Sequence, residues 1–276
     1  MTSYRTKQLV CNILKYILLI IVAIVMLFPL IVVVSSSFKM ETEIFAFPFT
    51  IFPKNPILTN FSQLKDNFPM YTWNSVKVTF ITTVVQLVTA STGAYVFSKI
   101  QWKGRNALFM LYVMSMMIPS QAVTVPQFII VRNMGLFDTH TAIVLLGAFT
   151  AVGTFLIRQY MLSIPETYNE AARIDGAREW VIFGRIILPM TKPVLITQAI
   201  FSFRYFWNDF YTPLLYIITP ELKTLPLGMT DFTTEQYVYY GPQMAAALIS
   251  IIPVLIIFLI GQKYFIQGVS AAGIKG

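Results

Sequence analysis

Apolar stretches without a charged side chain recur along this sequence, and each is long enough to cross a lipid bilayer. The first runs from Tyr16 to Phe38. An α-helix rises about 1.5 Å per residue and a bilayer core is about 30 Å thick, so this stretch can span it. The apolar core of a cleaved signal peptide is only about 7–15 residues long, which favours an uncleaved anchor here. The chain is therefore predicted to be a membrane protein.

Four further charge-free stretches, and a fifth that carries Arg204 and Asp209, complete a prediction of six membrane-spanning helices. We expect these spans at residues 16–38, 78–98, 106–131, 141–157, 193–218 and 242–262. Pro119 and Pro126 lie in the third span, and each removes a backbone donor, so we expect each to kink or break the helix. Such breaks are tolerated in a bilayer where protein or a water-lined cavity satisfies the freed carbonyls.

The polar segments between the spans define the organisation of the chain and its orientation. They divide it into an amino-terminal segment 1–15, a first connection 39–77, a five-helix core 78–262 that includes the loops 158–192 and 219–241, and a tail 263–276. Most Lys and Arg residues fall in 1–15, 99–105, 158–192 and 263–276. Basic loops stay on the cytoplasmic side, so both termini and 158–192 are predicted to be cytoplasmic, and 39–77 and 219–241 extracytoplasmic.

Composition and missing motifs exclude several other classes. Hydrophobic residues make up 56 % of the chain and charged residues 12 %, which argues against a soluble domain. The net charge of +8 comes from basic residues at the ends of apolar spans, so nucleic acid is not an expected partner. A single cysteine, Cys11, and a single histidine, His140, give no disulfide and no metal set. No phosphate-binding Gly-x-x-x-x-Gly-Lys-Ser/Thr motif occurs, so any ATP must be hydrolysed by a partner.

The loop 158–192 begins with a predicted polar helix. Ser163 and Glu166 have the spacing of a capping box, and Pro165 suits a first helical turn, so we expect a helix over 164–175. Along it Glu166, Glu170 and Arg173 share one side, with Glu170 and Arg173 close enough to interact.

A turn and a second helix are predicted to follow. Gly176 accepts the positive φ that closes many helices. Trp180, Phe183 and Ile187 recur at three- and four-residue spacing, which predicts a short amphipathic helix running up to Pro189. The loop is thus expected to form a helix-turn-helix between two spans.

This loop also resembles a known signature. Glu170-Ala171-Ala172, then Gly176, then Ile186-Ile187-Leu188-Pro189 is similar to the cytoplasmic loop of permease subunits in binding-protein-dependent ABC importers. The resemblance implies a coupling helix that docks on a separate ATPase subunit, with Glu170 as its anchor; the alternative is an ordinary solvated loop. The residues that the resemblance assigns to ATPase coupling are Glu170, Ala171, Ala172, Asp175, Gly176, Ile186, Leu188 and Pro189.

Further stretches resemble the carbohydrate branch of that family, and in particular the smaller permease of the maltose importer. They are Asn208-Asp209-Phe210 with Pro213-Leu214, residues 224–228, and the tail 267–276. The resemblance implies an all-α, multi-pass protein of the cell membrane with the type I ABC importer permease fold, six transmembrane helices and both termini cytoplasmic.

The same resemblance implies partners that this chain does not encode. They are a second, homologous permease subunit, two ATPase subunits that carry ATP and Mg, and an extracytoplasmic sugar-binding protein. No cofactor is expected on this chain, and it is not expected to be an enzyme. The loop 224–240 should meet the binding protein, and the tail Gly273, Ile274, Lys275 and Gly276 should reach the interface of the ATPase pair. Both could instead be exposed connections only.

The fifth span is the most polar one. Placing a charged side chain at the centre of the membrane costs about 2.5–3.5 kcal/mol of insertion free energy. Arg204 and Asp209 are therefore expected to face a partner helix or a water-filled pathway. Interleaved aromatic side chains suit the C–H faces of a sugar ring, and they equally suit helix packing. The candidate substrate path consists of Arg204, Trp207, Asn208, Asp209 and Tyr211.

The function that the resemblance implies is that of a permease subunit that moves a carbohydrate, in particular an oligosaccharide, by alternating access. Three alternatives are open. An ABC permease of the same family could carry amino acids, polyamines or phosphate. An ion-coupled secondary carrier would need intramembrane acids or an inverted repeat, for which Asp209 alone is thin support. A membrane anchor for a signalling complex would leave the polar and proline-containing spans unexplained.

Overall fold

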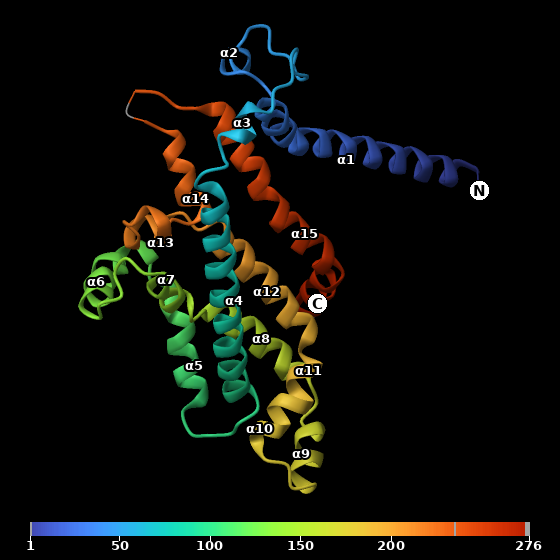
Figure 1. The fold of residues 1–276 in the computed structure, drawn as a ribbon. Coiled ribbons are helices and arrows are strands. Elements are labelled where there is room, and N and C mark those ends of the chain that lie inside the picture. Colours follow the sequence, from blue (N-terminus) through green and yellow to red (C-terminus); the bar gives the residue numbers. More distant parts are fainter. Residues whose placement is uncertain (1, 235, 274–276) are drawn as a thin grey trace. The chain divides into compact units, whose positions relative to one another are not determined.

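The computed structural model describes residues 2–234 and 236–273, and within these residues the chain is helical and contains no strand (Figure 1). Its one isolated β-bridge among the described residues joins Thr233 and Val238. The all-α prediction is confirmed. The chain divides into two units, Met1–Phe68 with Met229–Ile251, and Pro69–Gly228 with Ile252–Gly276.

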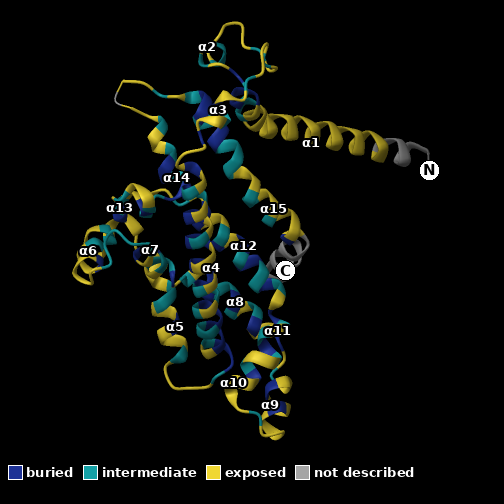
Figure 2. Ribbon diagram, viewed as in Figure 1, coloured by how far each residue is buried: buried dark blue, intermediate teal, exposed yellow. Residues whose placement is uncertain are grey.

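The first unit is built around the end of α1 and the start of α15. Its helices are α1 (Thr2–Ser37), α2 (Glu41–Ile44), α3 (Thr59–Ser62), η4 (Met229–Phe232) and the first part of α15 (Tyr240–Gly273). The buried Asn60 side chain donates to the carbonyls of Ser37 and Lys39, both at 2.9 Å. The Gly241 N–H donates to Glu41 Oε1 at 2.8 Å. These contacts order the connection after α1, whereas most of α1 itself is exposed (Figure 2).

The second unit holds the remaining helices. They are α4 (Phe68–Ser98), α5 (Arg105–Met114), η1 (Ser115–Met117), α6 (Ser120–Asn133), α7 (His140–Gly147), α8 (Ala151–Ser163), α9 (Thr167–Ile174), α10 (Glu179–Val181), η2 (Ile182–Ile187), α11 (Leu188–Met190), α12 (Lys192–Trp207), α13 (Tyr211–Tyr216), η3 (Pro220–Leu222), α14 (Leu225–Gly228) and the later part of α15. Helix α8 packs against both α5 and α12, and α7 packs against α13.

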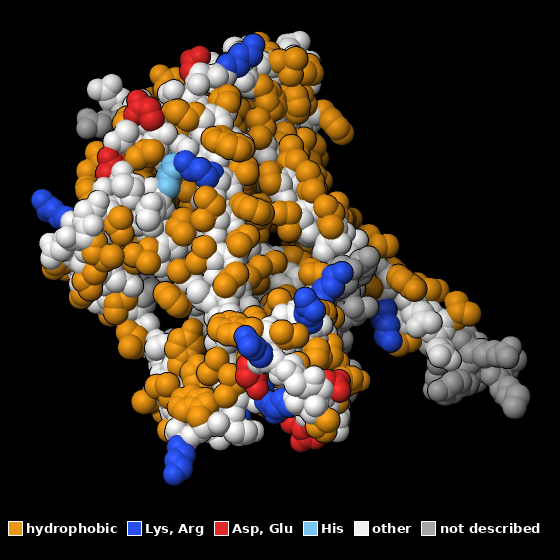
Figure 3. Space-filling model, turned by 60° about the horizontal axis from the view of Figure 1, so that its bottom comes forward, with side chains coloured by type: hydrophobic (Ala, Val, Ile, Leu, Met, Phe, Trp, Pro, Cys, Tyr) orange, Lys and Arg blue, Asp and Glu red, His pale blue; other side chains and the backbone are white. Residues whose placement is uncertain are grey.

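Helix lengths agree with the predicted spans only in part. Within the described residues, three helices are long and apolar enough to cross a membrane: Gln8–Ser37, Phe68–Ser98 and Tyr240–Gln262. Three more candidates are bent pairs: Arg105–Met117 with Ser120–Asn133 at 100°, His140–Gly147 with Ala151–Ser163 at 42°, and Glu179–Met190 with Lys192–Trp207 at 78°. Hydrophobic side chains cover much of the face drawn in Figure 3, as expected for a surface that meets lipid.

Prolines lie at two of these bends: Pro119 at the first, and Pro193, in the first turn of α12, at the third. Ile118 is extended, with ψ 118°, and α6 begins after Pro119, so the break expected there is confirmed. Of the kink or break expected at Pro126, no break occurs, because α6 runs through Pro126 to Asn133. A proline removes only one main-chain hydrogen bond from a helix, and α6 continues on both sides of Pro126.

A second break, between α7 and α8, contains no proline and was not predicted. The carbonyls that it frees are satisfied from α4: Gln86 Nε2 donates to the Gly147 carbonyl at 2.8 Å, and the Thr89 hydroxyl donates to the Ala148 carbonyl. On the other side of the break, Thr150 Oγ accepts from the Gly153 N–H at 3.1 Å. Side chains thus replace the main-chain partners that lipid cannot supply.

Candidate functional site

The predicted coupling helix is present but starts later than expected. Helix α9 begins at Thr167, and the predicted start at Ile164 is wrong because that residue is extended, with ψ 123°. Proline disfavours helical backbone angles in the residue before it, and Ile164 precedes Pro165. The capping box is also absent: Ser163 Oγ donates back to the Tyr160 carbonyl at 2.7 Å.

The end of α9 confirms the predicted role of Gly176. Its φ is +76°, and its N–H donates to the Arg173 carbonyl at 3.0 Å. The Ala177 N–H donates to the Ala172 carbonyl at 2.9 Å, which completes a Schellman motif. A Cβ at Gly176 would meet nothing within 4 Å. The backbone conformation, not packing, therefore favours glycine at this position.

The second helix of the loop runs from Glu179 to Met190 through the π-helical turn η2. The buried side chains are Ile182 and Ile187, which lie five residues apart as a π turn requires. The predicted inner face is wrong at Trp180, which is 79 % exposed. A widened turn shifts the side-chain period from that of an α-helix, and the sequence pattern does not signal it.

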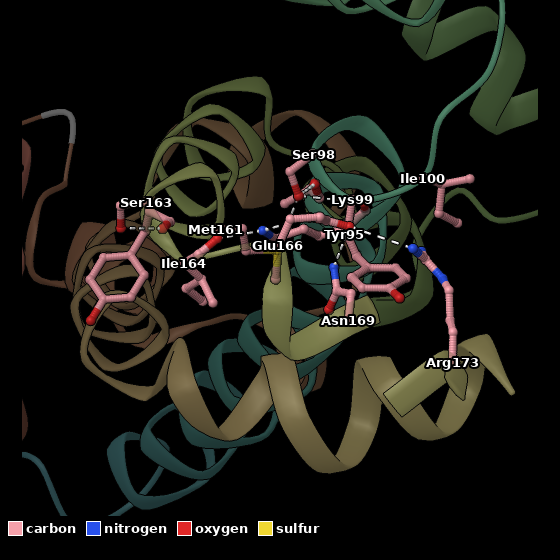
Figure 4. A network of polar contacts seen from close by, with 12 residues as sticks. Tyr95, Ser98, Lys99, Ile100, Met161, Ser163, Ile164, Glu166, Asn169 and Arg173 are labelled. Carbon is pink, nitrogen blue, oxygen red and sulfur yellow. Dashed lines mark hydrogen bonds and ion pairs between the residues drawn. The ribbon is translucent and has the colours of Figure 1, made fainter. Parts of the chain in front are cut away.

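A network of polar contacts links the end of α4 to α9 (Figure 4). Lys99 is 3 % exposed, and its Nζ donates to the Ile164 carbonyl at 2.7 Å and to Glu166 Oε2 at 3.2 Å. Glu166 Oε1 accepts from Asn169 Nδ2 at 3.0 Å and lies 3.6 Å from Arg173 Nη1. A buried lysine therefore fixes the chain immediately before the coupling helix.

The same network continues into the second half of the loop. Arg173 Nε donates to Glu179 Oε1 at 3.0 Å, and the Tyr95 hydroxyl donates to Glu179 Oε2 at 2.7 Å. The expected Glu170–Arg173 contact is wrong, since Arg173 pairs with Glu166 and Glu179 instead. Among the residues that the structure describes, no ion pair or hydrogen bond engages the Glu170 carboxylate. Glu170 is exposed and available to another protein.

The other residues assigned to ATPase coupling differ in how far they are buried. The residues Ala171, Asp175, Gly176 and Pro189 are exposed, whereas Ile186 and Leu188 are half-buried. Ala172 is 6 % exposed and lies in a core with Ala90, Tyr95 and Ile157. In the predicted tail, Gly273 is the last described residue of α15, and Ile274, Lys275 and Gly276 lie outside the described residues.

Two exposed apolar residues of this loop escaped sequence reasoning. Ile174 is 85 % exposed at the end of α9, and Trp180 is 79 % exposed. Large apolar side chains in a polar loop were the available signal, but the sequence pattern placed Trp180 with Phe183 and Ile187 on the apolar side of the second helix and assigned no face to Ile174. Their exposure marks this loop as a surface suited to a protein partner.

The predicted substrate-path residues differ in their surroundings, and only two of them line one cavity. Arg204 and Asn208 are exposed, and Asn208 Nδ2 donates to the Arg204 carbonyl at 2.8 Å. Trp207 is 1 % exposed and stacks on Phe203 with the ring centroids 5.6 Å apart. Asp209 and Tyr211 line a cavity of about 180 Å³. The cavity is bounded by residues of α6, α7, α12 and α13, and sequence spacing could not bring these helices together.

Comparison with known proteins gives a consistent family. A family model described as "Binding-protein-dependent transport system inner membrane component" matches residues 87–271. The chain is 33 % identical over 260 residues to the arabinooligosaccharides transport system permease protein AraQ of Halalkalibacterium halodurans, covering 92 % of this chain and 93 % of the relative. It is 34 % identical to the multiple sugar-binding transport system permease protein MsmG of Streptococcus mutans, covering 95 % and 96 %.

A solved structure shows the same architecture. A chain of a bacterial ABC transporter involved in the import of the acidic polysaccharide alginate matches with a TM-score of 0.83 and 25 % identity, covering 93 % of this chain and 96 % of that chain. Together with the exposed helix that ends at Gly176, these matches show that the chain belongs to the inner membrane components of binding-protein-dependent ABC transport systems.

Proposed function

We propose that this chain is one of two permease subunits in an ABC importer that carries a carbohydrate, in particular an oligosaccharide. The observation that carries the proposal is α9, a short exposed helix whose Glu170 has no partner among the described residues. The substrate class rests on the relatives, which are named for arabinooligosaccharide and multiple-sugar transport. The second permease, two ATPases and an extracytoplasmic sugar-binding protein complete the assembly.

The proposed topology has six spans with both termini in the cytoplasm. Three unbroken helices and three bent pairs supply enough apolar length for six crossings. The excess of basic residues in 1–15, 99–105, 158–192 and 263–276 supports the orientation. The loop 224–240 would then meet the binding protein, and the tail 273–276 would reach the ATPase pair.

In the proposed mechanism, ATP-driven closure of the ATPase pair moves α9, and the polar network passes that movement to α4. Glu170 anchors the helix on the ATPase, and Ala171 allows close approach. Lys99 and Tyr95 hold the two halves of the loop on the end of α4. Helix and span therefore move together, and the sugar path opens alternately to each side.

The test is to express the chain with its neighbouring transporter genes, purify the complex and reconstitute it in liposomes. ATPase activity and uptake are then measured with a panel of neutral and acidic oligosaccharides delivered on the binding protein. The proposal expects ATPase stimulation by at least one saccharide and a loss of stimulated uptake in Glu170→Ala. Asp66→Asn, a carboxylate change at an exposed residue outside the loop, serves as the control.

Two outcomes would contradict the proposal. A chain that purifies without an ATPase and drives uptake with an ion gradient would be a secondary carrier. Stimulation by amino acids or polyamines, and by no saccharide, would keep the ABC permease and reject the carbohydrate.

A further inference from the structure

The cavity beside Asp209 lies where three helical stretches are interrupted. Ser120 is the first residue of α6, immediately after the break at Pro119. Gly147 is the last residue of α7, at the break before α8. Asp209 itself lies between the end of α12 and the start of α13. In membrane proteins, irregular backbone at depth is found where it lines a protein-enclosed or water-filled cavity.

The cavity is lined by polar groups, and at least one of them has hydrogen-bonding capacity that the described residues do not satisfy. Asp209 Oδ1 accepts from the Thr212 N–H at 3.1 Å, whereas Oδ2 has no donor among the described residues. Thr124 Oγ1 and the Tyr211 hydroxyl lie 3.3 Å apart across the cavity wall. The free oxygen of Asp209 is therefore an acceptor that the cavity offers to a ligand.

Charge and size restrict what the cavity can hold. Asp209 is the charged residue in its lining, and no Lys or Arg is among the described residues that line it. An anionic ligand would therefore meet a carboxylate and no compensating cation. The volume of about 180 Å³ is below the range of about 300–1,000 Å³ that is typical of sites for drug-sized ligands. One sugar ring fits these limits better than a longer chain.

We infer that this cavity is a substrate subsite that binds a single neutral sugar ring, with Asp209 accepting hydrogen bonds from its hydroxyls and Tyr211 flanking the ring. The inference rests on the proposed carbohydrate function and adds to it. It assigns direct substrate contact to this subunit, and it selects against uronic acids at this position. The comparison chain from an alginate importer belongs to a transporter of an acidic polysaccharide, so the two chains should differ in this preference.

The test measures weak ligand binding directly, apart from transport. The assembled complex in nanodiscs is titrated with methyl glucoside and with methyl glucuronide, and binding is followed by saturation-transfer difference NMR. These two probes differ only at C6, which is a hydroxymethyl group in one and a carboxylate in the other. Wild type should bind the glucoside more tightly. Asp209→Asn should weaken glucoside binding about tenfold or more, because a hydrogen bond to a charged group is lost.

The same substitution should narrow the difference between the probes, because it removes the repulsion of the glucuronide. Asn keeps an oxygen that can accept from the Thr212 N–H, so the fold at the break is preserved. Tyr211→Leu removes the ring that flanks the sugar and provides a second variant that should also weaken glucoside binding. Asp66→Asn is the control for loss of one carboxylate.

Failure of this subsite is distinguishable from failure of the proposed function. Sugar-stimulated uptake with no glucoside signal in wild type would overturn the subsite and leave the importer intact. Equal binding of both probes by wild type would overturn the selection against acids. An unchanged ratio of the two affinities in Asp209→Asn would overturn the role of Asp209.

Discussion

The Lys99 side chain donates a 2.7 Å hydrogen bond to the main-chain carbonyl of Ile164, across 65 positions of sequence. Lys99 directly follows α4, and Ile164 lies between the end of α8 at Ser163 and the start of α9 at Thr167. The Lys99 side chain is 3 % exposed, and its ammonium group also pairs with Glu166. The end of a long membrane helix and the entrance to α9 are thus held by one buried cation.

Lys99→Met should loosen this connection while keeping the length and apolar stem of the side chain. A hydrogen bond to a charged group contributes about 1.5–3 kcal/mol, and the Ile164 carbonyl would lose its donor. We expect a lower thermal midpoint of the purified complex and a lower ratio of sugar transported to ATP hydrolysed. Lys103→Met, at an exposed position of the following turn, is the matched control. Full coupling in Lys99→Met would show that the network does not transmit movement.

The Tyr95 hydroxyl holds the second half of the loop in the same way, through its 2.7 Å bond to Glu179. Tyr95→Phe should lower coupling in the same direction as Lys99→Met, and with a smaller loss of stability because the ring still fills its place in the core. Tyr16→Phe, at an exposed residue of α1, controls for the loss of one hydroxyl. The measurement is the transport to ATPase ratio in proteoliposomes. A ratio equal to wild type in Tyr95→Phe would assign this contact to stability alone.

Sequence reasoning was most successful where one residue decides a local conformation. Gly176 was expected to take a positive φ, and it does, at +76°. It failed where the outcome depends on contacts far apart in the chain. The hydrogen bond from Gln86 to the Gly147 carbonyl joins residues 61 positions apart. It satisfies a carbonyl at a helix break that contains no proline and that the sequence therefore does not signal. The cavity at Asp209 depends in the same way on four helices that only the folded chain brings together.

Gly176→Val should disturb the loop through the backbone alone. An L-residue in the left-handed region costs about 1–2 kcal/mol, and a β-branched one is the least tolerant. The expected result is ATP hydrolysis that is no longer coupled to uptake, with the spans still inserted. Gly184→Val is a matched control, because its Cβ also meets nothing within 4 Å and its φ is not positive. Gly176→Asn should retain more coupling than Gly176→Val, since Asn tolerates this region. Equal activity of the Val and Asn variants would contradict the conformational argument.

Gln86→Leu tests the break between α7 and α8. It leaves the Gly147 carbonyl without its donor, and it also removes the acceptor of the Ser202 hydroxyl. An unsatisfied buried polar group costs about 1–3 kcal/mol, so we expect reduced yield and a lower thermal midpoint. Thr92→Val, also on α4, removes a hydroxyl that bonds only to its own helix and should have little effect. If both variants were equally stable, the carbonyl would have to find another partner.

Asp138 should make the stability of the complex depend on pH. Its carboxylate accepts from the Thr219 hydroxyl and from the N–H groups of Thr219 at 3.0 Å and Ile218 at 2.9 Å. The bond from the Thr219 hydroxyl, followed by the two main-chain bonds, holds the pKa of Asp138 below its ordinary value of 3.8. The stabilisation is therefore fully present above that ordinary value and is lost as the pH falls through the lower, folded-state pKa.

Asp138→Asn is the variant that isolates this contribution, since Asn tolerates the positive φ of 60° at this position. It should lower the thermal midpoint of the purified complex at neutral pH. The difference in thermal midpoint between Asp138→Asn and wild type should shrink as the pH falls below 3.8. The wild-type carboxyl is then increasingly protonated and, like the Asn amide, carries no charge. Asp66→Asn, an exposed carboxylate, should show no such convergence. A difference between Asp138→Asn and wild type that stays constant with pH would mean that the ionised carboxylate does not hold the turn after α6 to the segment after α13.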